Sequence, residues 1–441
     1  MKLAHFLGFS LAIVTLALPT PALGDDRLPE ERTQSEEETP TEAVDRMERK
    51  WEEEYETYFD ADLGDISLSP AEIAAQLEQM AAETGQRTAV LYAAAMPDQL
   101  KLVLVTPGSE PELIFLTDVT REQIDSAVFD LNTQIRNPRL RRRDDYLEPA
   151  GQLYNWIVGT FSESLERENI DTIVFCLGEG LRAMPLAALH DGDDFIIEEY
   201  SLGQIPAFNL MEPGHEPLTD ALVLAMGASV FEELEPLPAV PVELNHIISN
   251  LWGGELYKES DFTIDRLDSA IEERRFGIIH LATHADFEPG TPDNSYIQFA
   301  NDRLSLDRLR EFDWHDPPLD LLVLSACETA VGDLDAELGF AGLAFQSGVK
   351  SALASLWYVS DAGTLALMSE FYYQLKQTST KSEALRKAQM ELLAGNVKIE
   401  GGKLITSGGT IDLPGEFAGV DSADFSHPFF WSAFTLIGNP W

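Results

Sequence analysis

Two side chains that could together carry out nucleophilic catalysis lie at the ends of apolar segments. His284 ends the segment that starts at Ile278, and Cys327 ends the segment that starts at Leu321. Both segments have the composition of buried strands, and the sites of open parallel sheets form outside the carboxyl ends of their strands. A thiol attacks as its thiolate, and a neighbouring imidazole is the simplest base that can produce it. The pair therefore suggests cysteine chemistry.

Spacing alone leaves a structural interpretation open for each of these residues. A single cysteine on an apolar strand is usually a buried packing residue, and we interpret His280 as a buried structural histidine. The His280-x₃-His284 pair lacks the internal glutamate and the helix of a zinc peptidase motif. Neither Gly-x-Ser-x-Gly nor a phosphate-binding Gly-x₄-Gly-Lys-Ser/Thr occurs, which weakens the serine-hydrolase and nucleotide-binding alternatives.

The elements around these residues alternate between apolar strands and helices. We expect strands at 88–93, 100–106, 113–116, 172–177, 222–226, 276–282, 321–325 and 351–357, with a closing strand within 427–437. We expect helices at 121–132, 153–165, 242–251, 340–347 and 362–375. Strands that are apolar throughout and alternate with helices predict an α/β fold with a mostly parallel sheet covered on both faces.

The N-terminal region carries two further helix signals. Apolar residues from Val44 to Phe59 recur mostly at steps of three and four, with glutamate on the other face, which predicts a helix. We expect this helix to dock on the body of the protein, although such an aromatic stripe also suits a partner's groove. A capping box at Ser69-Pro-Ala-Glu72 predicts a second helix ending near Glu83.

Composition and charge exclude several classes of function. The 441 residues include 30 Lys and Arg against 76 Asp and Glu, a formal net charge of −46. Such a chain repels phosphate, so we expect no nucleic-acid partner. Two cysteines cannot form a disulfide framework, and no Cys-x-x-Cys motif suggests a metal centre. We interpret Cys176 as structural and expect both thiols to be free. The only basic cluster, Arg136–Arg143, suggests an exposed loop or, alternatively, a protease processing site.

The first residues have the pattern of a secretory signal. Lys2 is followed by an apolar run from Phe6 to Leu18 and a small-x-small site, Ala22-x-Gly24. The run is too short to span a bilayer. We therefore predict a signal peptide at 1–24, an acidic linker and amphipathic helix at 25–68, and an exported protein with no membrane span after signal removal.

Several motifs in one order resemble the CHAT-domain family, whose members are related to caspases and separases. They are His280-Leu-Ala-Thr-His284, Leu324-Ser-Ala-Cys327-Glu-Thr329, Ala354-Ser-Leu-Trp357 with Asp361, Phe371-Tyr-Tyr-Gln-Leu375, Ala384-Leu-Arg-Lys-Ala-Gln389 and Trp431-Ser-Ala-Phe434. Earlier matches include Gly180-Leu-Arg182. The sequence resembles the cyanobacterial members of the family most, among those without an N-terminal tetratricopeptide array. No self-similarity at a period of about 34 residues occurs, so such an array is not expected here.

This resemblance implies a caspase-like three-layer α/β/α fold. A degenerate N-terminal subdomain would begin within 69–145, and the CHAT domain would occupy 146–441. His284 would be the general base and Cys327 the nucleophile of peptide-bond cleavage, without a cofactor or a metal. Backbone N–H groups of Cys327 and Ala285 would form the oxyanion hole. The implied partner is a protein or peptide substrate, and the oligomeric state stays open.

Two departures from the family pattern bear on activity. Ala285 and Ala330 stand where relatives commonly have glycine, and a Cβ at a left-handed position would misplace an oxyanion donor. A pseudoprotease that binds peptides without turnover is therefore the alternative function. Asp361 suggests, by analogy with the family, an S1 pocket for a basic residue; the alternative is a helix N-cap.

Overall fold

The computed structural model describes residues 38–61, 67–312, 318–329, 332–417 and 422–441, and for Cys327 it describes the backbone only. The expected signal peptide at 1–24 lies outside the described residues. Residues Pro40–Trp441 form one compact unit.

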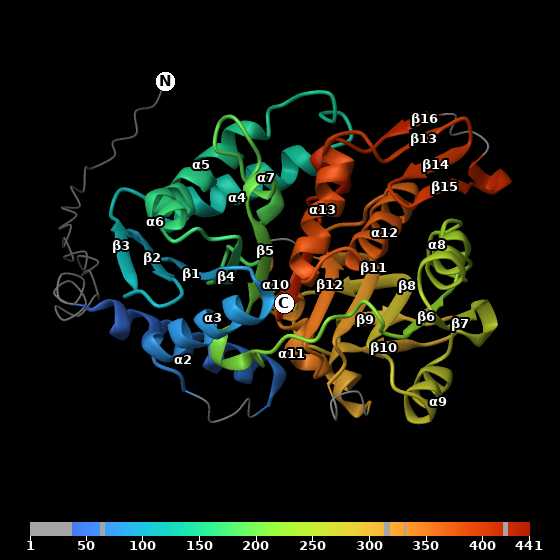
Figure 1. The fold of residues 1–441 in the computed structure, drawn as a ribbon, viewed down its shortest axis with the longest axis horizontal. Coiled ribbons are helices and arrows are strands. Elements are labelled where there is room, and N and C mark those ends of the chain that lie inside the picture. The colour runs from blue at the N-terminus through green and yellow to red at the C-terminus, as the bar shows by residue number, and fades with distance from the viewer. Residues whose placement is uncertain (1–37, 62–66, 313–317, 330–331, 418–421) are drawn as a thin grey trace, which may run out of the picture. The chain divides into compact units, whose positions relative to one another are not determined.

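One large sheet runs through this unit (Figure 1). Among the described residues it has thirteen strands: β1 (Thr88–Ala95), β2 (Leu100–Val105), β3 (Glu112–Leu116), β4 (Thr172–Leu177), β5 (Ser201–Ile205), β6 (Val223–Gly227), β7 (Gly254–Lys258), β8 (Ile278–Phe287), β9 (Tyr296–Gln298), β10 (Arg303–Ser305), β11 (Leu321–Thr329), β12 (Ser351–Ser355) and β17 (Phe434–Gly438). The main order is β10-β9-β8-β11-β12-β17-β5-β4-β1-β2-β3, and β6 joins both β7 and β8. Most neighbouring pairs in the centre of the sheet are parallel, which confirms the predicted α/β class.

Helices cover both faces of the N-terminal half of the sheet. The helices here are α2 (Pro40–Phe59), α3 (Pro70–Thr84), α4 (Arg121–Arg136), α5 (Leu147–Ile157), α6 (Ser162–Arg167) and α7 (Ile196–Glu199). Val90 and Cys176 face a core shared with α2 and α3, whereas Leu91 and Phe175 face the core shared with α4 and α5. Because consecutive strand residues point to opposite faces, this alternation places the sheet between two helical layers.

The C-terminal half has the same layering. Its helices are α8 (Val240–His246), α9 (Ile264–Glu273), α10 (Leu334–Ala341), α11 (Leu343–Ser347), α12 (Asp361–Leu375) and α13 (Lys381–Leu393). His280 of β8 contacts α8 and α12, whereas Phe287 of the same strand packs on Phe340 of α10. In Figure 1, α12 and α13 lie on one side of the sheet and α11 on the other. A small second sheet has the strands β13 (Lys398–Glu400), β14 (Lys403–Thr406), β15 (Gly409–Asp412) and β16 (Ser422–Asp424).

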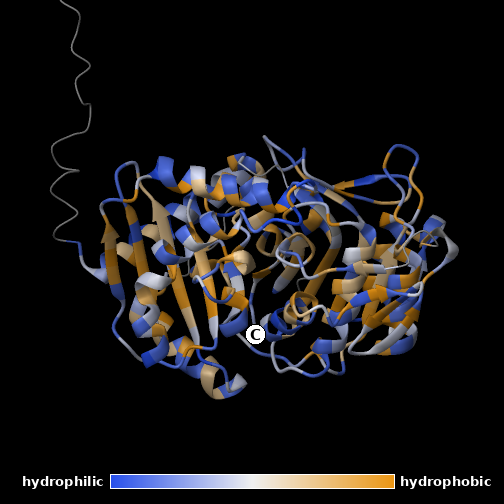
Figure 2. Ribbon diagram, turned by 90° about the horizontal axis from the view of Figure 1, so that it is seen from above, coloured by the Kyte–Doolittle hydropathy of each residue, from blue (hydrophilic) through white to orange (hydrophobic). Residues whose placement is uncertain are grey.

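The main strands of both halves are apolar along most of their length, as Figure 2 shows, while the helices carry their polar residues outward. β4 has no exposed residue, and β12 likewise is buried throughout. β12 and one face of β4 belong to a hydrophobic core that extends through both halves, and the other face of β4 belongs to the core shared with α2 and α3. The family's three-layer α/β/α arrangement is therefore present.

The helix predicted from the Val44–Phe59 stripe is α2, and it docks on the body of the protein. Trp51 and Tyr55 are almost fully buried, and the Trp51 ring stacks on Tyr92 at 6.1 Å between centroids. The capping box at Ser69 is also confirmed, since its side chain accepts from the Glu72 N–H while the Glu72 carboxylate accepts from the Ser69 N–H. Both helices are integral to the fold.

Some predicted elements are wrong in extent. The helix expected at 153–165 is α5 and α6 separated by a 3₁₀ turn at Gly159–Phe161. The helix expected at 340–347 is divided at Gly342, where a Cβ would lie 2.6 Å from the Phe59 ring. The strand expected within 427–437 begins only at Phe434, because Pro428 starts a 3₁₀ turn instead.

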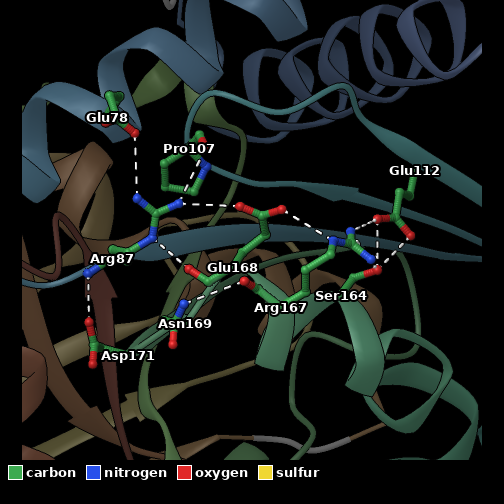
Figure 3. Close-up of polar contacts among 9 residues, drawn as sticks. All are labelled: Glu78, Arg87, Pro107, Glu112, Ser164, Arg167, Glu168, Asn169 and Asp171. Atoms are coloured by element: carbon green, nitrogen blue, oxygen red, sulfur yellow. Dashed lines mark hydrogen bonds and ion pairs between the residues drawn. The ribbon is translucent and has the colours of Figure 1, made fainter.

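A polar network joins the outer strands of the N-terminal half to their helices (Figure 3). Arg87 at the start of β1 contacts Glu168, and Arg167 of α6 forms an ion pair with Glu112 of β3 at 2.8 Å. Ser164 donates to the same Glu112 carboxylate at 2.7 Å. Exposed ion pairs of this kind are screened by solvent, so the network fixes geometry more than it adds stability.

Candidate active site

β8 and β11 bring the backbones of His284 and Cys327 close together, one register step apart. The two strands are parallel neighbours, and their register pairs Ala326 with His284 and Cys327 with Ala285. Adjacent strands lie about 4.8 Å apart, so the two backbones are close, while the ladder partner of His284 is Ala326 and that of Cys327 is Ala285. The register shifts between Leu324 and Ala326, and such irregularities are common beside active sites. The Cys327 side chain lies outside the described residues, so its contact with the imidazole stays a prediction.

Both strands continue past the two candidate residues, which differs from the expectation that His284 and Cys327 end them. β8 extends to Phe287, and β11 extends with it to Thr329. The cause is the hairpin strand β9, which pairs with β8 at Ala285 and Asp286 and lengthens the ladder. The site therefore forms on a paired part of the sheet.

His284 is held by contacts on both sides of its ring. The Phe231 ring meets it edge-on at 5.1 Å, and the Tyr358 ring stacks at 6.1 Å between centroids. Its Nε2 lies 2.9 Å from the backbone carbonyl oxygen of Glu235. Because a carbonyl oxygen only accepts, Nε2 carries the hydrogen, and in the neutral ring Nδ1 is the nitrogen that can take a proton.

Asp361 anchors the loop that carries Glu235. It is the first residue of α12, and its Oδ2 accepts a hydrogen bond from the Ala239 N–H at 2.5 Å. Burial, with a smaller contribution from Glu243, raises the pKa of Asp361 to about 7, while the hydrogen bond from the Ala239 N–H opposes the shift. The loop between β6 and α8 is thus tied at Ala239 to α12 and at Glu235 to His284.

The N-cap alternative for Asp361 is wrong, because the cap of α12 is Ser360. The Ser360 hydroxyl accepts from the Gly363 N–H at 3.3 Å, one residue earlier than expected. Asp361 lies within the first helical turn, and its carboxylate bonds to a loop instead of its own helix. Burial raises the pKa of Tyr358 and the charge of Asp361 adds to the shift, so Asp361 lies near a residue that contacts His284.

The sequence matches the model of a known protein family over most of its length. The model of the CHAT domain matches residues 147–439, well over half of the chain. The chain belongs to the CHAT-domain family. The match begins at α5, although β1–β3 of the preceding region belong to the same sheet as β4. Comparison with curated proteins gives no match.

Solved structures with a similar fold include separase. The separase–securin complex of Saccharomyces cerevisiae, solved at 3.0 Å, aligns with a TM-score of 0.51 at 10% identity, covering 83% of this chain and 31% of that chain. A 2.6 Å structure of the same complex aligns with a TM-score of 0.50 at 10% identity, covering 91% and 34%. The protein thus spans about a third of those separase chains. At this identity the likeness concerns the fold alone, which is the caspase-like peptidase fold.

Beneath His284, the CHAT domain contains a second, fully buried histidine. His280 lies between Tyr372, whose hydroxyl is 3.0 Å from Nδ1, and Glu243, whose carboxylate is 2.8 Å from Nε2. All three residues are buried, so the carboxylate and hydroxyl satisfy a polar ring that would otherwise be costly to bury. This confirms the structural interpretation of His280.

Ala285 has an ordinary backbone conformation. It lies in β8, is 1% exposed, and is not among the described non-glycine residues with positive φ. The expectation that its Cβ could strain the backbone after His284 therefore does not apply. Ala330 lies outside the described residues. Whether the Ala285 and Cys327 N–H groups bind an oxyanion stays a prediction.

Cys176 is remote from the site. It is buried and free on β4, which β5, β17 and β12 separate from β11. Burial raises the pKa of its thiol well above the usual value, and nearby Glu48 adds to the shift. A thiol of this kind is unreactive at neutral pH, which agrees with a structural role.

The basic cluster Arg136–Arg143 contacts the strand of Cys327. Arg136 forms an ion pair with Glu328, the residue after Cys327, at 3.4 Å. Arg141 lies over the Phe429 ring at 3.7 Å, so part of the cluster packs against the CHAT domain. Arg139, Arg142 and Arg143 are exposed, as expected for a loop.

No described group of three His, Cys, Asp or Glu side chains has an arrangement that could hold a metal ion. Within the same residues, no helix combines the length and hydrophobicity that crossing a membrane requires.

The sequence motifs located His284, Cys327 and Asp361 but missed the residues that hold the imidazole. Glu235 acts through its backbone carbonyl, so its side-chain type carries no signal. Phe231 and Tyr358 belong to connections between elements, where an aromatic residue alone predicts no partner. The only hint in the sequence was that Tyr358 directly follows the Ala354–Trp357 motif.

Proposed function

We propose that the CHAT domain is a cysteine endopeptidase with Cys327 as the nucleophile and His284 as the general base. The observation that carries the proposal is the environment of His284. Its strand neighbours the strand of Cys327, and the Glu235 carbonyl holds the Nε2 hydrogen so that Nδ1 is available as the base. An orienting acceptor of this kind serves the base in other nucleophile–base pairs.

The reaction would proceed in two stages. The imidazole takes the Cys327 proton, the thiolate attacks the scissile carbonyl carbon, and the carbon–nitrogen bond breaks as the imidazolium protonates the leaving amine. Water, deprotonated by the same imidazole, then hydrolyses the thioester and restores the thiol. The N–H groups of Cys327 and Ala285 are the proposed donors to the oxyanion.

We further propose that Asp361 favours a basic residue before the scissile bond. The raised pKa of its partly buried carboxyl supports this role, because a bound cation would offset the desolvation that causes the shift. Asp361→Asn retains an oxygen that can accept from Ala239, whereas Asp361→Ala removes it. If the charge selects substrate, Asp361→Asn should lose the preference for Arg or Lys while keeping wild-type stability. An unchanged cleavage profile in Asp361→Asn would reject this role.

The export of the protein is also a proposal, supported by the sequence of residues 1–24. Expression of the protein with and without these residues, followed by fractionation, tests it. Retention of both forms in the cytoplasm would exclude a signal function for the segment.

Labelling with a thiol-reactive peptide probe tests the catalytic assignment. We expect the wild type to be labelled, Cys327→Ala to be unlabelled, and His284→Ala to be labelled about 10²-fold more slowly. Cys176→Ala is the matched control, since it removes the other thiol, and it should be labelled like the wild type. A peptide library would then report turnover by the same variants.

The outcomes separate the two candidate functions. Labelling that persists in Cys327→Ala would place the reactive thiol elsewhere and reject the assignment. Absence of labelling and of turnover in the wild type, together with binding of peptides, would instead favour a pseudoprotease that acts as an interaction module.

A further inference from the structure

An open pocket is lined by Phe231, whose ring contacts His284. Its volume is about 560 Å³, within the range of roughly 300–1,000 Å³ that ligand sites occupy. One wall comes from the loop between β6 and α8 and the other from the β9–β10 hairpin. Its lining includes Phe231, Glu232, Glu233, Gln298, Asp302 and Arg303.

The pocket lies on the imidazole side of the proposed dyad. β6 and β9 both pair with the edge of β8 that faces away from β11, the strand of Cys327 (Figure 1). Phe231, which lines the pocket, contacts the His284 ring directly. The opposite wall is tied to the same strand, because the Thr283 hydroxyl donates to the Gln298 carbonyl at 2.5 Å.

The chemistry of the dyad determines which part of a substrate reaches this side. The acyl carbon becomes bonded to the Cys327 sulfur, while the nitrogen that leaves takes its proton from the imidazolium. The leaving segment, which follows the scissile bond, must therefore pass the His284 side. The pocket is placed to receive a side chain of that segment.

The pocket is acidic, and its one basic side chain is already engaged. Glu232, Glu233 and Asp302 contribute three carboxylates. The Arg303 guanidinium lies over the Tyr296 ring at 4.1 Å and donates to Gln298 Oε1 at 3.1 Å. In the part of the protein that the structure describes, no basic side chain forms an ion pair with Glu232 or Glu233, and both are exposed. A cationic side chain is the ligand that complements this lining.

We propose that this pocket binds the side chain of a lysine or arginine that follows the scissile bond. The proposal rests on the peptidase function proposed above, and it is separate from the role of Asp361, which concerns the residue before the bond. The enzyme would then select basic residues on the leaving side through solvent-accessible carboxylates, so the selectivity should weaken as salt increases.

The first test uses quenched peptides that differ only after the scissile bond, with Arg, Ala or Glu at the first three positions. We expect wild-type kcat/KM to be roughly tenfold higher for Arg than for Ala at low salt. In the double variant Glu232→Gln/Glu233→Gln this preference should fall about fivefold, mainly because KM for the Arg peptide rises. Glu272→Gln/Glu273→Gln, a consecutive exposed pair at the end of α9, is the matched control and should behave like the wild type.

A second test does not need turnover. In the Cys327→Ala background, fluorescence anisotropy measures binding of the same peptides, and the Arg peptides should bind about fivefold more weakly after the Glu232/Glu233 exchange. Cleavage without any preference after the bond would overturn the pocket proposal and leave the peptidase intact. Binding of Arg peptides that depends on Glu232 and Glu233, without cleavage by the wild type, would support the pocket and reject the peptidase. Equal binding with and without the exchange would overturn the pocket.

Discussion

At the residue scale, the alanine after His284 is accommodated by the sheet. Ala285 lies in a strand with a neighbour on each side, opposite Cys327 on β11 and Ile297 on β9, and it is almost fully buried. Extended backbone admits any residue, so a glycine gains nothing there. The additional freedom of glycine in the unfolded state would instead lower stability.

We therefore expect Ala285→Gly to destabilise the protein by roughly 1 kcal/mol without raising the reactivity of Cys327. Urea unfolding measures the first effect, and the rate of labelling by a thiol-reactive peptide measures the second. A clear gain in labelling rate would show that the alanine impairs the site and that the backbone here changes during catalysis.

The same scale shows what sequence could predict of the site. His284 and Cys327 were recognisable because their side-chain types and strand positions carry the proposed chemistry. The tautomer of His284 depends on the carbonyl of Glu235, which any residue type could provide. The link from Asp361 to Ala239 likewise joins positions far apart in sequence, so only the folded protein reveals it.

At the scale of elements, α2 is part of the core although it precedes the CHAT domain in sequence. Its buried face contacts β1, and its last residue, Phe59, packs against Gly342 between α10 and α11. Glu54 of this helix forms an ion pair with the buried Arg182. α2 therefore connects the N-terminal half to the helices that follow the strand of Cys327.

Trp51→Ala should accordingly lower the unfolding free energy by about 3–5 kcal/mol, because it empties a large buried site. Glu53→Ala, an exposed position on the same helix, is the control and should change stability by less than about 1 kcal/mol. Equal stability of the two variants would mean that α2 detaches in solution, as a partner-binding helix would.

Elements with continuous apolar sequences were predictable, and those without them were not. β4 matches its predicted bounds at Thr172–Leu177, since all six residues are apolar or buried. β7 was missed because its residues are only half-buried and mixed in character. β9 and β10, three residues each, depend on pairing with β8 for their existence and leave no periodic pattern.

At the scale of the whole molecule, buried ionisable groups change the unfolding free energy in opposite directions as pH changes. Burial raises the pKa of Glu48, and likewise that of Glu337, from 4.5 to about 7, so each group's contribution is present below pH 4.5 and lost as pH rises towards 7. Burial lowers the pKa of His427 from 6.5 to about 4, so its contribution is present above pH 6.5 and lost as pH falls towards 4. The large negative charge adds repulsion at higher pH.

We expect the unfolding free energy to be higher near pH 5.5 than at pH 7.5, as measured by chemical denaturation across this range. Glu48→Gln should reduce the difference by about 2 kcal/mol, because the amide does not ionise. Glu53→Gln removes an exposed carboxylate from the same helix and should leave the profile almost unchanged. A profile that rises steadily from pH 5.5 to 7.5 would contradict the assignment of these buried carboxyls.

The position of β17 has a consequence for how the protein folds. It is the last strand of the sequence, yet it lies inside the sheet, antiparallel to β12 on one side and parallel to β5 on the other. Until it is inserted, β12 and β5 each present an open edge that can pair with other molecules. Productive folding therefore depends on β17 being inserted before such pairing occurs, and loss of Phe434–Gly438 should yield an aggregating protein rather than a shortened folded one.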